Sequence, residues 1–207
     1  MKIIKKYFPD LSTEQENQLS NLELIYKRWN SKINVISRKS IKDINTHHIL
    51  HSLSIVKIIK FRKDSKIMDL GTGGGFPGIP LAIMNPQANF ILIDSIRKKI
   101  KVVKEVCDLI KIKNIEAHHM RAEHIDEKFD FIISRGVTQM NKFIKLTQNK
   151  FNHEHKNNLE NGIIYLKGGD LKIELNNIQH TSYDIADFFK EDFFLSKKII
   201  HISKNEL

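Results

Sequence analysis

From residue 66 onward, short apolar runs alternate with amphipathic stretches, and this alternation restricts the fold more than any other feature of the chain. Five runs have the length of buried strands: 67–70, 90–93, 115–118, 129–134 and 163–166. The stretch after the second run carries apolar residues at helical spacing, as at Ile96, Ile100 and Val103. Strands that alternate with helices form a mostly parallel sheet with right-handed crossovers and helices on both faces. We therefore predict an α/β fold with a ligand crevice at the carboxyl ends of its strands.

The first part of the chain has a helical pattern instead. Ser12 or Thr13 can cap a first helix, with Gln15 or Glu16 closing a capping box, and apolar residues follow at helical spacing. A second helix is expected over residues 46–59, where apolar side chains again recur on one face. The pattern indicates a helical segment that precedes the sheet.

The last part of the chain should complete the sheet. Residues 182–189 and 196–203 have extended patterns that could form an antiparallel edge, whereas 149–161 is polar and without periodicity, as in a surface loop. No internal repeat or interdomain linker interrupts the chain. We expect residues 1–60 to form an N-terminal helical cap and residues 61–207 a single compact domain.

The composition suits a soluble protein with an anionic partner. A chain of 207 residues can bury a core of its own, and it contains no signal-peptide pattern and no run of about 18 apolar residues, so we expect it in the cytoplasm without a membrane partner. Its single cysteine, Cys107, excludes an internal disulfide and should be a small buried residue. The net charge of +10 favours a polyanion such as nucleic acid.

A glycine-rich segment, MDLGTGGGFPGIPLAI at residues 68–83, follows the first predicted strand. Gly73, Gly75 and Gly78 satisfy the G-x-G-x-x-G spacing of dinucleotide-binding loops, and Asp94 follows at an interval that suits the hydroxyls of a ribose. Pro77 is placed as a first-turn residue of the helix that comes next. On this pattern a nicotinamide-dependent oxidoreductase is an open alternative.

Asp69, at the end of the same strand, favours a different ligand. A carboxylate there would repel a pyrophosphate and attract a cation. S-adenosylmethionine carries a sulfonium and an ammonium group, glycines such as Gly73 let the backbone approach its methionine moiety, and Asp94 can accept both ribose hydroxyls. The competing interpretation is a structural Asp69 that caps the loop or the following helix.

Charged side chains gather where the predicted strands end. Because parallel strands bring their carboxyl ends to one edge, Asp94, Arg121, Arg135 and Lys167 are expected to lie there together. Only six of the 34 basic residues are arginine, and three of the six, counting Arg97, fall at this edge. Arginine offers a planar, bidentate set of donors, so its concentration here indicates a functional site.

Further motifs extend the pattern over most of the chain. They are RWNSKINVISR (28–38), HHILHSLSI (47–55), DSIRKKIKVVKEV (94–106), RAEHI (121–125), FDFIISRGV (129–137) and YLKGGDL (165–171). In this order, and with the proline-containing glycine loop, the sequence resembles the ribosomal RNA small-subunit methyltransferase G family, also called glucose-inhibited division protein B.

The resemblance implies a Rossmann-like class I S-adenosylmethionine-dependent methyltransferase that methylates N7 of a guanine in 16S ribosomal RNA. It places cofactor contacts at Gly71, Phe76, Ala122, Glu123 and Arg135, with Asp94 as the ribose-binding acid of the class. With Gly73 from the glycine loop, these residues form the expected cofactor pocket.

The sequence departs from the family pattern in two places. Residues 47–52 read HHILHS where the family usually has Arg-His-Leu-Leu-Asp-Ser, and Gly136 replaces the alanine that usually follows the arginine. The first departure bears on local contacts with cofactor or RNA, and the second should matter little. His47 and His51 are four residues apart, as in zinc-binding helices, but no third ligand is evident, and we expect no metal.

The implied chemistry requires few groups. Guanine N7 already carries a free lone pair and no proton, so we expect no catalytic base, and the rate should come from positioning. Cys107 lies within a predicted helix, which disfavours a cysteine-dependent mechanism, and SRGV stands where amine methylases place an Asp/Asn-Pro-Pro-aromatic motif. We predict RNA contacts at Arg97, Lys98, Lys99 and Lys167.

The expected partner is 16S ribosomal RNA or a small-subunit particle, with a monomeric protein favoured. Two alternatives stay open on the sequence. The first is the nicotinamide-dependent oxidoreductase, which would bind NAD. The second is a non-catalytic basic RNA-binding module, whose RNA affinity would not depend on Asp94 and which would bind no cofactor.

Overall fold

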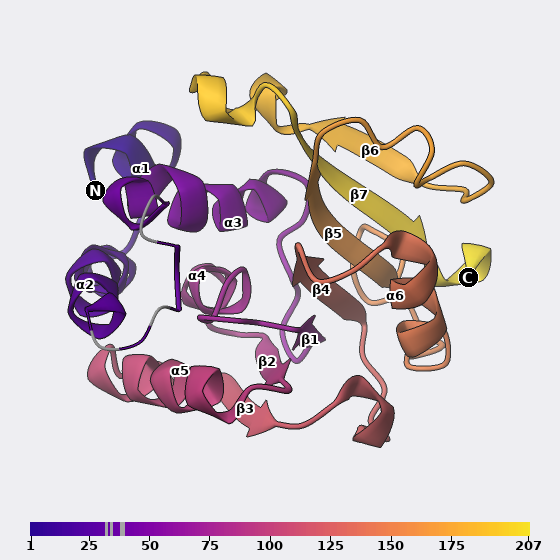
Figure 1. The fold of residues 1–207 in the computed structure, drawn as a ribbon, viewed down its shortest axis with the longest axis horizontal. Coiled ribbons are helices and arrows are strands. Elements are labelled where there is room, and N and C mark those ends of the chain that lie inside the picture. The colour runs from indigo at the N-terminus through magenta and orange to yellow at the C-terminus, as the bar shows by residue number, and fades with distance from the viewer. Residues whose placement is uncertain (32, 34, 38–39) are drawn as a thin grey trace.

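A seven-stranded sheet forms the centre of the computed structural model, which describes residues 1–31, 33, 35–37 and 40–207 (Figure 1). Its strands are β1 (Lys66–Leu70), β2 (Asn89–Asp94), β3 (Ile115–His119), β4 (Phe131–Arg135), β5 (Gly162–Gly168), β6 (Thr181–Asp184) and β7 (Lys197–Ser203). The order across the sheet is β3-β2-β1-β4-β5-β7-β6. Strands β1 to β5 are parallel, and β7 is antiparallel to both β5 and β6. The predicted α/β sheet and its antiparallel edge are confirmed.

Helices cover both faces of this sheet (Figure 1). The α-helices of the described residues are α1 (Lys2–Tyr7), α2 (Thr13–Asn30), α3 (His51–Leu53), α4 (Gly78–Met84), α5 (Arg97–Leu109) and α6 (Met140–Thr147). Apolar side chains of α2, α4 and α5 share one core with Phe90 and Leu92 of β2. On the other face, Met140 and Phe143 of α6 pack with Ile132 of β4. Since strand side chains alternate between faces, the near-continuous apolar strands are buried on both sides.

The N-terminal helices belong to the same core as the sheet. Helix α2 begins at the predicted capping box, in which the side chain of Ser12 accepts from the backbone of Gln15 and the reverse bond is also made. Leu22 and Tyr26 of this helix are fully buried in the cluster that contains Phe90. Each such side chain contributes roughly 1.5–3 kcal/mol when it leaves water. The division of the chain at residue 60 into cap and domain stays a prediction.

The second predicted helix is present but irregular. It begins with a π-helical turn over Asn45–Leu50, continues as α3 and ends in a 3-10 turn over Ser54–Lys57. Wide turns of this kind are concentrated at functional sites. The regular helix expected over residues 46–59 is therefore wrong in detail, and the irregular turn faces the site described below.

Two local predictions have different outcomes. Cys107 is buried on α5, as expected for a small apolar residue. Pro77 lies at the N-cap position immediately before α4 rather than in its first turn.

The polar stretch 149–161 is a loop with a single bridge at Phe151. Searched over the described residues, no helix is both long enough and apolar enough to cross a membrane.

Candidate functional site

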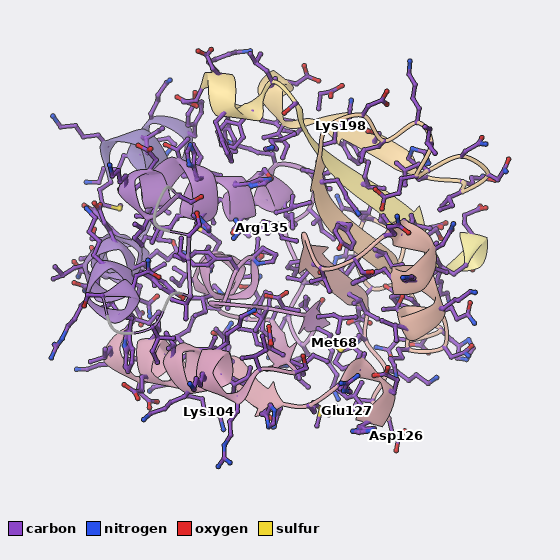
Figure 2. The ribbon with its side chains drawn as sticks, in the orientation of Figure 1. Met68, Lys104, Asp126, Glu127, Arg135 and Lys198 are labelled. Carbon is purple, nitrogen blue, oxygen red and sulfur yellow. The ribbon has the colours of Figure 1, made fainter. Side chains whose placement is uncertain are left out.

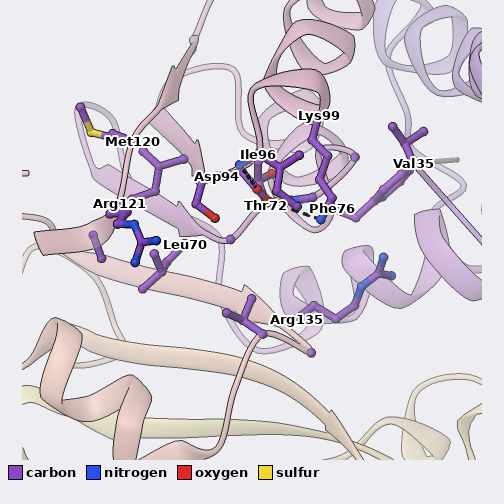
Figure 3. Close-up of a pocket in the computed structure, with 18 of the residues that line it drawn as sticks. Val35, Leu70, Thr72, Phe76, Asp94, Ile96, Lys99, Met120, Arg121 and Arg135 are labelled. Atoms are coloured by element: carbon purple, nitrogen blue, oxygen red, sulfur yellow. Dashed lines mark hydrogen bonds and ion pairs between the residues drawn. The ribbon is translucent and has the colours of Figure 1, made fainter. Parts of the chain in front are cut away.

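A cavity of about 470 Å³ opens at the carboxyl ends of the parallel strands (Figure 3). The turns that follow β1, β2, β3 and β4 supply most of its lining. All seven residues predicted for cofactor contact line it: Gly71, Gly73, Phe76, Asp94, Ala122, Glu123 and Arg135. Figure 3 shows Asp94, Arg121 and Arg135 around this cavity, at or just beyond the ends of three different strands. The expectation that the strand ends bring charged residues together agrees with the geometry for these three, whereas Lys167, expected with them, does not line the cavity.

The glycine turn after β1 depends on backbone conformations that favour glycine. Gly71 has φ of +71° and Gly73 has φ of +60°. A Cβ atom at Gly71 would lie 2.5 Å from Cγ2 of Val137, which follows β4. The backbone at Gly71 is therefore packed directly against the side chain of Val137, which leaves no space for a side chain at this position.

Asp94 joins the glycine turn to the end of β2. Its Oδ2 accepts a hydrogen bond from the backbone N–H of Gly73 at 2.9 Å, and its Oδ1 accepts from that of Ile96 at 2.8 Å. The Nζ of Lys99 lies 3.8 Å from Oδ2. Because a carboxylate has about four lone-pair sites, these bonds orient Asp94 and leave acceptor capacity for the hydroxyls of a ligand.

Asp69 does not reach the cavity. It is fully buried, and its Oδ2 accepts from the Thr72 hydroxyl at 2.6 Å and from the Gly78 backbone N–H at 2.8 Å, at the first turn of α4. The prediction that its carboxylate receives a cationic ligand is wrong, because the helix N-terminus offers free N–H donors that take the carboxylate instead. Burial raises the pKa of Asp69 to about 7 against the opposing hydrogen bonds from Thr72 and Gly78.

Arg135, the last residue of β4, forms the opposite wall of the cavity. Its Nη1 donates to the backbone carbonyl of His47 at 3.2 Å, and its Nη2 lies 2.7 Å from Nδ1 of His48. Its guanidinium carbon is 5.4 Å from the centre of the Phe76 ring. Burial lowers the pKa of Arg135 to about 10, so the side chain remains a cation at neutral pH.

Two large apolar residues of the lining were missed by the sequence analysis. Ile96, which follows β2, is 47% exposed, and Met120 follows β3 close to the predicted, buried Ala122. Glu123 is exposed at the same turn. The sequence did carry a signal for Ile96, because it is a large apolar residue two positions after Asp94 at the predicted strand end. The apolar surface of Ile96 and Met120 suits a flat aromatic group of a ligand.

The four predicted RNA-contact residues divide into two groups. Arg97 and Lys98 are exposed in the first turn of α5, outside the cavity, and Lys99 lies in its lining. Lys167 differs, because its Nζ donates to the carbonyl of Thr138 at 2.9 Å and pairs with Glu174 at 2.6 Å. Its side chain is 11% exposed, so its placement does not favour a contact with RNA.

The two histidines considered for zinc point to different surroundings. His47 stacks on Phe193 with ring centres 4.0 Å apart, and His51 is buried with an Nε2 that has no partner in the described part of the chain. A search of the described residues finds no cluster of three or more side chains that could ligate a metal.

Comparison with known proteins identifies the family of this chain. The family model described as rRNA small subunit methyltransferase G matches residues 15–197. The chain belongs to this family. A ribosomal RNA small subunit methyltransferase G from Flavobacterium johnsoniae is 50% identical over 203 residues, which cover 98% of this chain and 97% of the relative. One from Phocaeicola vulgatus is 49% identical over 205 residues and covers 98% of both chains.

Solved structures of more distant proteins share the fold. A SAM-dependent methyltransferase from Aquifex aeolicus superposes with a TM-score of 0.57 at 13% identity, over 80% of this chain and 98% of that one. A precorrin-6y C5,15-methyltransferase from Geobacter metallireducens gives 0.56 at 12% identity, over 83% and 91%. The mostly parallel sheet with its antiparallel β7 is therefore the Rossmann-like methyltransferase fold.

Membership in the family confirms the resemblance seen in the sequence and favours a methyltransferase over the oxidoreductase alternative. One of the motifs that carried the resemblance, residues 28–38, is described only in part, since residues 32, 34 and 38 lie outside the described residues. The described residues Val35 and Ile36 of this motif line the cavity.

Proposed function

We propose that this protein transfers a methyl group from S-adenosylmethionine to N7 of a guanine in 16S ribosomal RNA. The observation that carries the proposal is that the glycine turn, Asp94 and Arg135 line the same cavity, in a chain of the rRNA small subunit methyltransferase G family. The names of relatives about 50% identical support the substrate, which for them is small-subunit ribosomal RNA.

The residues of the cavity fit the proposed cofactor. Asp94 keeps lone pairs that can accept the ribose hydroxyls, and Arg135 has N–H groups for the carboxylate of the methionine end. Ile96 and Met120 provide apolar surface for the adenine ring, and the glycine turn leaves room for the methionine backbone beside Gly73.

The chemistry supplied by the cofactor is a methyl group on a positively charged sulfur. As the carbon–sulfur bond breaks, its electron pair stays on sulfur, and the lone pair of guanine N7 forms the new carbon–nitrogen bond. No proton is transferred, so the side chains need only hold the two reactants in line and exclude water. We propose Gly71, Gly73, Phe76, Ala122 and Glu123 for this positioning, in addition to Asp94 and Arg135.

A basic surface beside the cavity suits the phosphates of RNA. Arg97, Lys98, Lys101 and Lys104 of α5 are exposed, and Lys99 links them to the cavity. Figure 2 shows Lys104 on the outer side of α5, while Arg135 lies between the helices and the sheet. We propose this helix as the RNA-contact surface, with Lys167 left out because it is paired with Glu174.

The proposal is tested by incubating the protein with labelled S-adenosylmethionine and 16S RNA, free or in small-subunit particles, and mapping the labelled nucleotide. We expect one guanine to acquire a positively charged, alkali-labile base. Label on an exocyclic amine or a ribose would contradict the N7 assignment.

Binding measurements separate the alternatives. We expect S-adenosylhomocysteine to bind the wild-type protein in a calorimeter and the Asp94→Ala variant to lose that binding. Tight NAD binding without either result would favour an oxidoreductase. RNA affinity that is unchanged in Asp94→Ala, together with no cofactor binding by the wild type, would indicate a non-catalytic RNA-binding module.

A further inference from the structure

The π-helical turn Asn45–Leu50 changes which backbone carbonyls are available next to the cavity. In a regular α-helix the N–H of His51 would bond to the carbonyl of His47, four residues earlier. Here the N–H of His51 bonds to the carbonyls of Thr46 and His48 instead. The carbonyl of His47 accepts a hydrogen bond from Nη1 of Arg135 at 3.2 Å. The wide turn thus places a backbone acceptor against the guanidinium.

The side chain of the next residue provides a second acceptor. Nδ1 of His48 lies 2.7 Å from Nη2 of Arg135. A guanidinium has only donors, so Nδ1 must be the unprotonated nitrogen of the ring, and His48 is the neutral Nε2–H tautomer. Burial, followed by the positive charge of Arg135, lowers the pKa of His48 to about 3, which agrees with this state.

The ring of Phe76, in the glycine turn, lies beside both His48 and Arg135. Its ring centre lies 5.1 Å from that of His48 and 5.4 Å from the guanidinium carbon of Arg135. Within the described residues no carboxylate lies within 4.0 Å of the Arg135 nitrogens. Both hydrogen-bond partners of Arg135 are therefore neutral. The buried Asp69 raises the pKa of Arg135 but makes no ion pair with it, so the guanidinium can still pair with an anionic group of a ligand.

We propose that His48 is a positioning residue that, together with the carbonyl of His47, orients Arg135 toward the carboxylate of the bound cofactor. This inference rests on the proposed function, because it takes S-adenosylmethionine as the ligand. His48 acts through Arg135 and takes no part in the transfer of the methyl group. The role depends on an acceptor at the Nδ1 position, because a side chain of similar size without one leaves Nη2 of Arg135 without this partner.

Four single variants test the role by calorimetric binding of S-adenosylhomocysteine, a readout independent of RNA. His48→Leu and His48→Ala remove the acceptor, and we expect about tenfold weaker binding. His48→Asn keeps an oxygen near the Nδ1 position and should bind within about threefold of the wild type. His47→Leu is the matched control, because it keeps the backbone carbonyl and changes only a side chain that stacks on Phe193. Thermal unfolding of each variant shows that the measured protein is folded.

A double variant tests whether His48 acts through Arg135. Lysine in place of Arg135 cannot make the two Nη bonds, so His48→Leu should change the Kd of Arg135→Lys by less than about twofold. A merely structural contribution of His48 would lower affinity by the same factor in both backgrounds, and that result would overturn the proposal. Wild-type affinity in His48→Leu, or equal losses in His48→Asn and His48→Leu, would overturn it as well.

The outcome is distinguishable from failure of the proposed function. A wild-type protein that binds S-adenosylhomocysteine but methylates no 16S RNA would contradict the proposed substrate and leave the role of His48 supported by the variants. A wild-type protein that binds no S-adenosylhomocysteine would contradict both.

Discussion

The hydroxyl group of Tyr26 donates a hydrogen bond to the backbone carbonyl of Gly74, so a side chain of α2 holds the glycine turn. The ring of Tyr26 also packs against that of Phe76, with centres 4.9 Å apart. Tyr26 is fully buried, and burial raises its pKa well above 10, which keeps the donor protonated. The shape of the cofactor turn therefore depends on a helix that precedes the sheet in sequence.

Replacing this tyrosine should weaken cofactor binding more than its distance from the ligand suggests. Tyr26→Phe leaves the carbonyl of Gly74 without its donor, and we expect the free energy of unfolding to fall by about 1–2 kcal/mol. S-adenosylhomocysteine should bind roughly threefold to tenfold more weakly, because the turn is less firmly held. Calorimetry and urea unfolding measure the two effects.

Tyr7→Phe is the control for Tyr26→Phe. The hydroxyl of Tyr7 bonds to Glu191 and accepts from the backbone of Lys190, away from the cavity. The Tyr7→Phe variant should therefore have a lower free energy of unfolding but an unchanged affinity for S-adenosylhomocysteine. An equal loss of affinity in both variants would show that binding follows global stability rather than the contact with Gly74.

The sequence contained enough information for the sheet because burial on both faces produces apolar runs that are separated by helical patterns. Each of the five predicted runs overlaps a parallel strand, from β1 at Lys66–Leu70 to β5 at Gly162–Gly168. The edge with the cavity followed from topology, since parallel strands end at one side. Predicting which residues lie at that edge did not require knowing where their side chains point.

The directions of individual side chains were beyond the sequence. Asp69 turns beneath the glycine loop to the N-terminus of α4, and Lys167 meets Glu174, which lies in a loop without regular structure that no pattern predicts. The π-helical turn at Asn45–Leu50 carries no glycine or proline to signal it. Each of these depends on tertiary contacts that override local preference.

Two glycines that flank the cavity should respond differently to alanine. Gly136 has φ of +64° but open space around a Cβ atom, so Gly136→Ala should cost about 1–2 kcal/mol of stability with little change in cofactor affinity. Gly71 also has a positive φ, of +71°, and a Cβ atom there would lie only 2.5 Å from Cγ2 of Val137. We therefore expect Gly71→Ala to lose stability and also to abolish measurable binding of S-adenosylhomocysteine.

Gly169→Ala is the control for backbone strain in this pair. Gly169 has φ of +86° and nothing near a Cβ atom, and the cavity lining does not include it. Thermal unfolding and calorimetry of the three variants separate strain from contact. Normal binding by Gly71→Ala would mean that the loop with Val137 moves without consequence for the cofactor turn.

Charge reversal on α5 should weaken RNA binding without affecting the cofactor. Lys101→Glu and Lys104→Glu each remove an exposed cation from the proposed RNA surface. If each contacts one phosphate, the slope of log K against log salt concentration for 16S RNA should become shallower by about 0.7–0.9 per contact. Lys63→Glu is the control. It changes an exposed lysine just before β1, at the amino ends of the parallel strands and so at the end opposite the cavity, and it should leave the slope unchanged. Equal slopes for all variants would place the RNA elsewhere.

The buried carboxyl of Asp69 should make stability depend on pH in a defined range. Its pKa is about 7 in the folded protein, against 3.8 for an exposed aspartate. Between these values the folded protein holds a proton that the unfolded chain has lost. The free energy of unfolding should therefore fall as the pH rises from about 4 to about 7, by at most about 1.4 kcal/mol per pH unit, and this contribution should be constant above pH 7.

Asp69→Asn isolates this contribution, because asparagine keeps an oxygen that can accept from Thr72 and Gly78 and does not titrate. Urea unfolding of both proteins at pH 5 and pH 7 gives the difference in their free energies of unfolding. We expect the wild type to lose about 2–3 kcal/mol relative to the variant between these pH values. A difference that does not change with pH would mean that the hydrogen bonds from Thr72 and the α4 terminus outweigh burial and keep Asp69 ionised throughout.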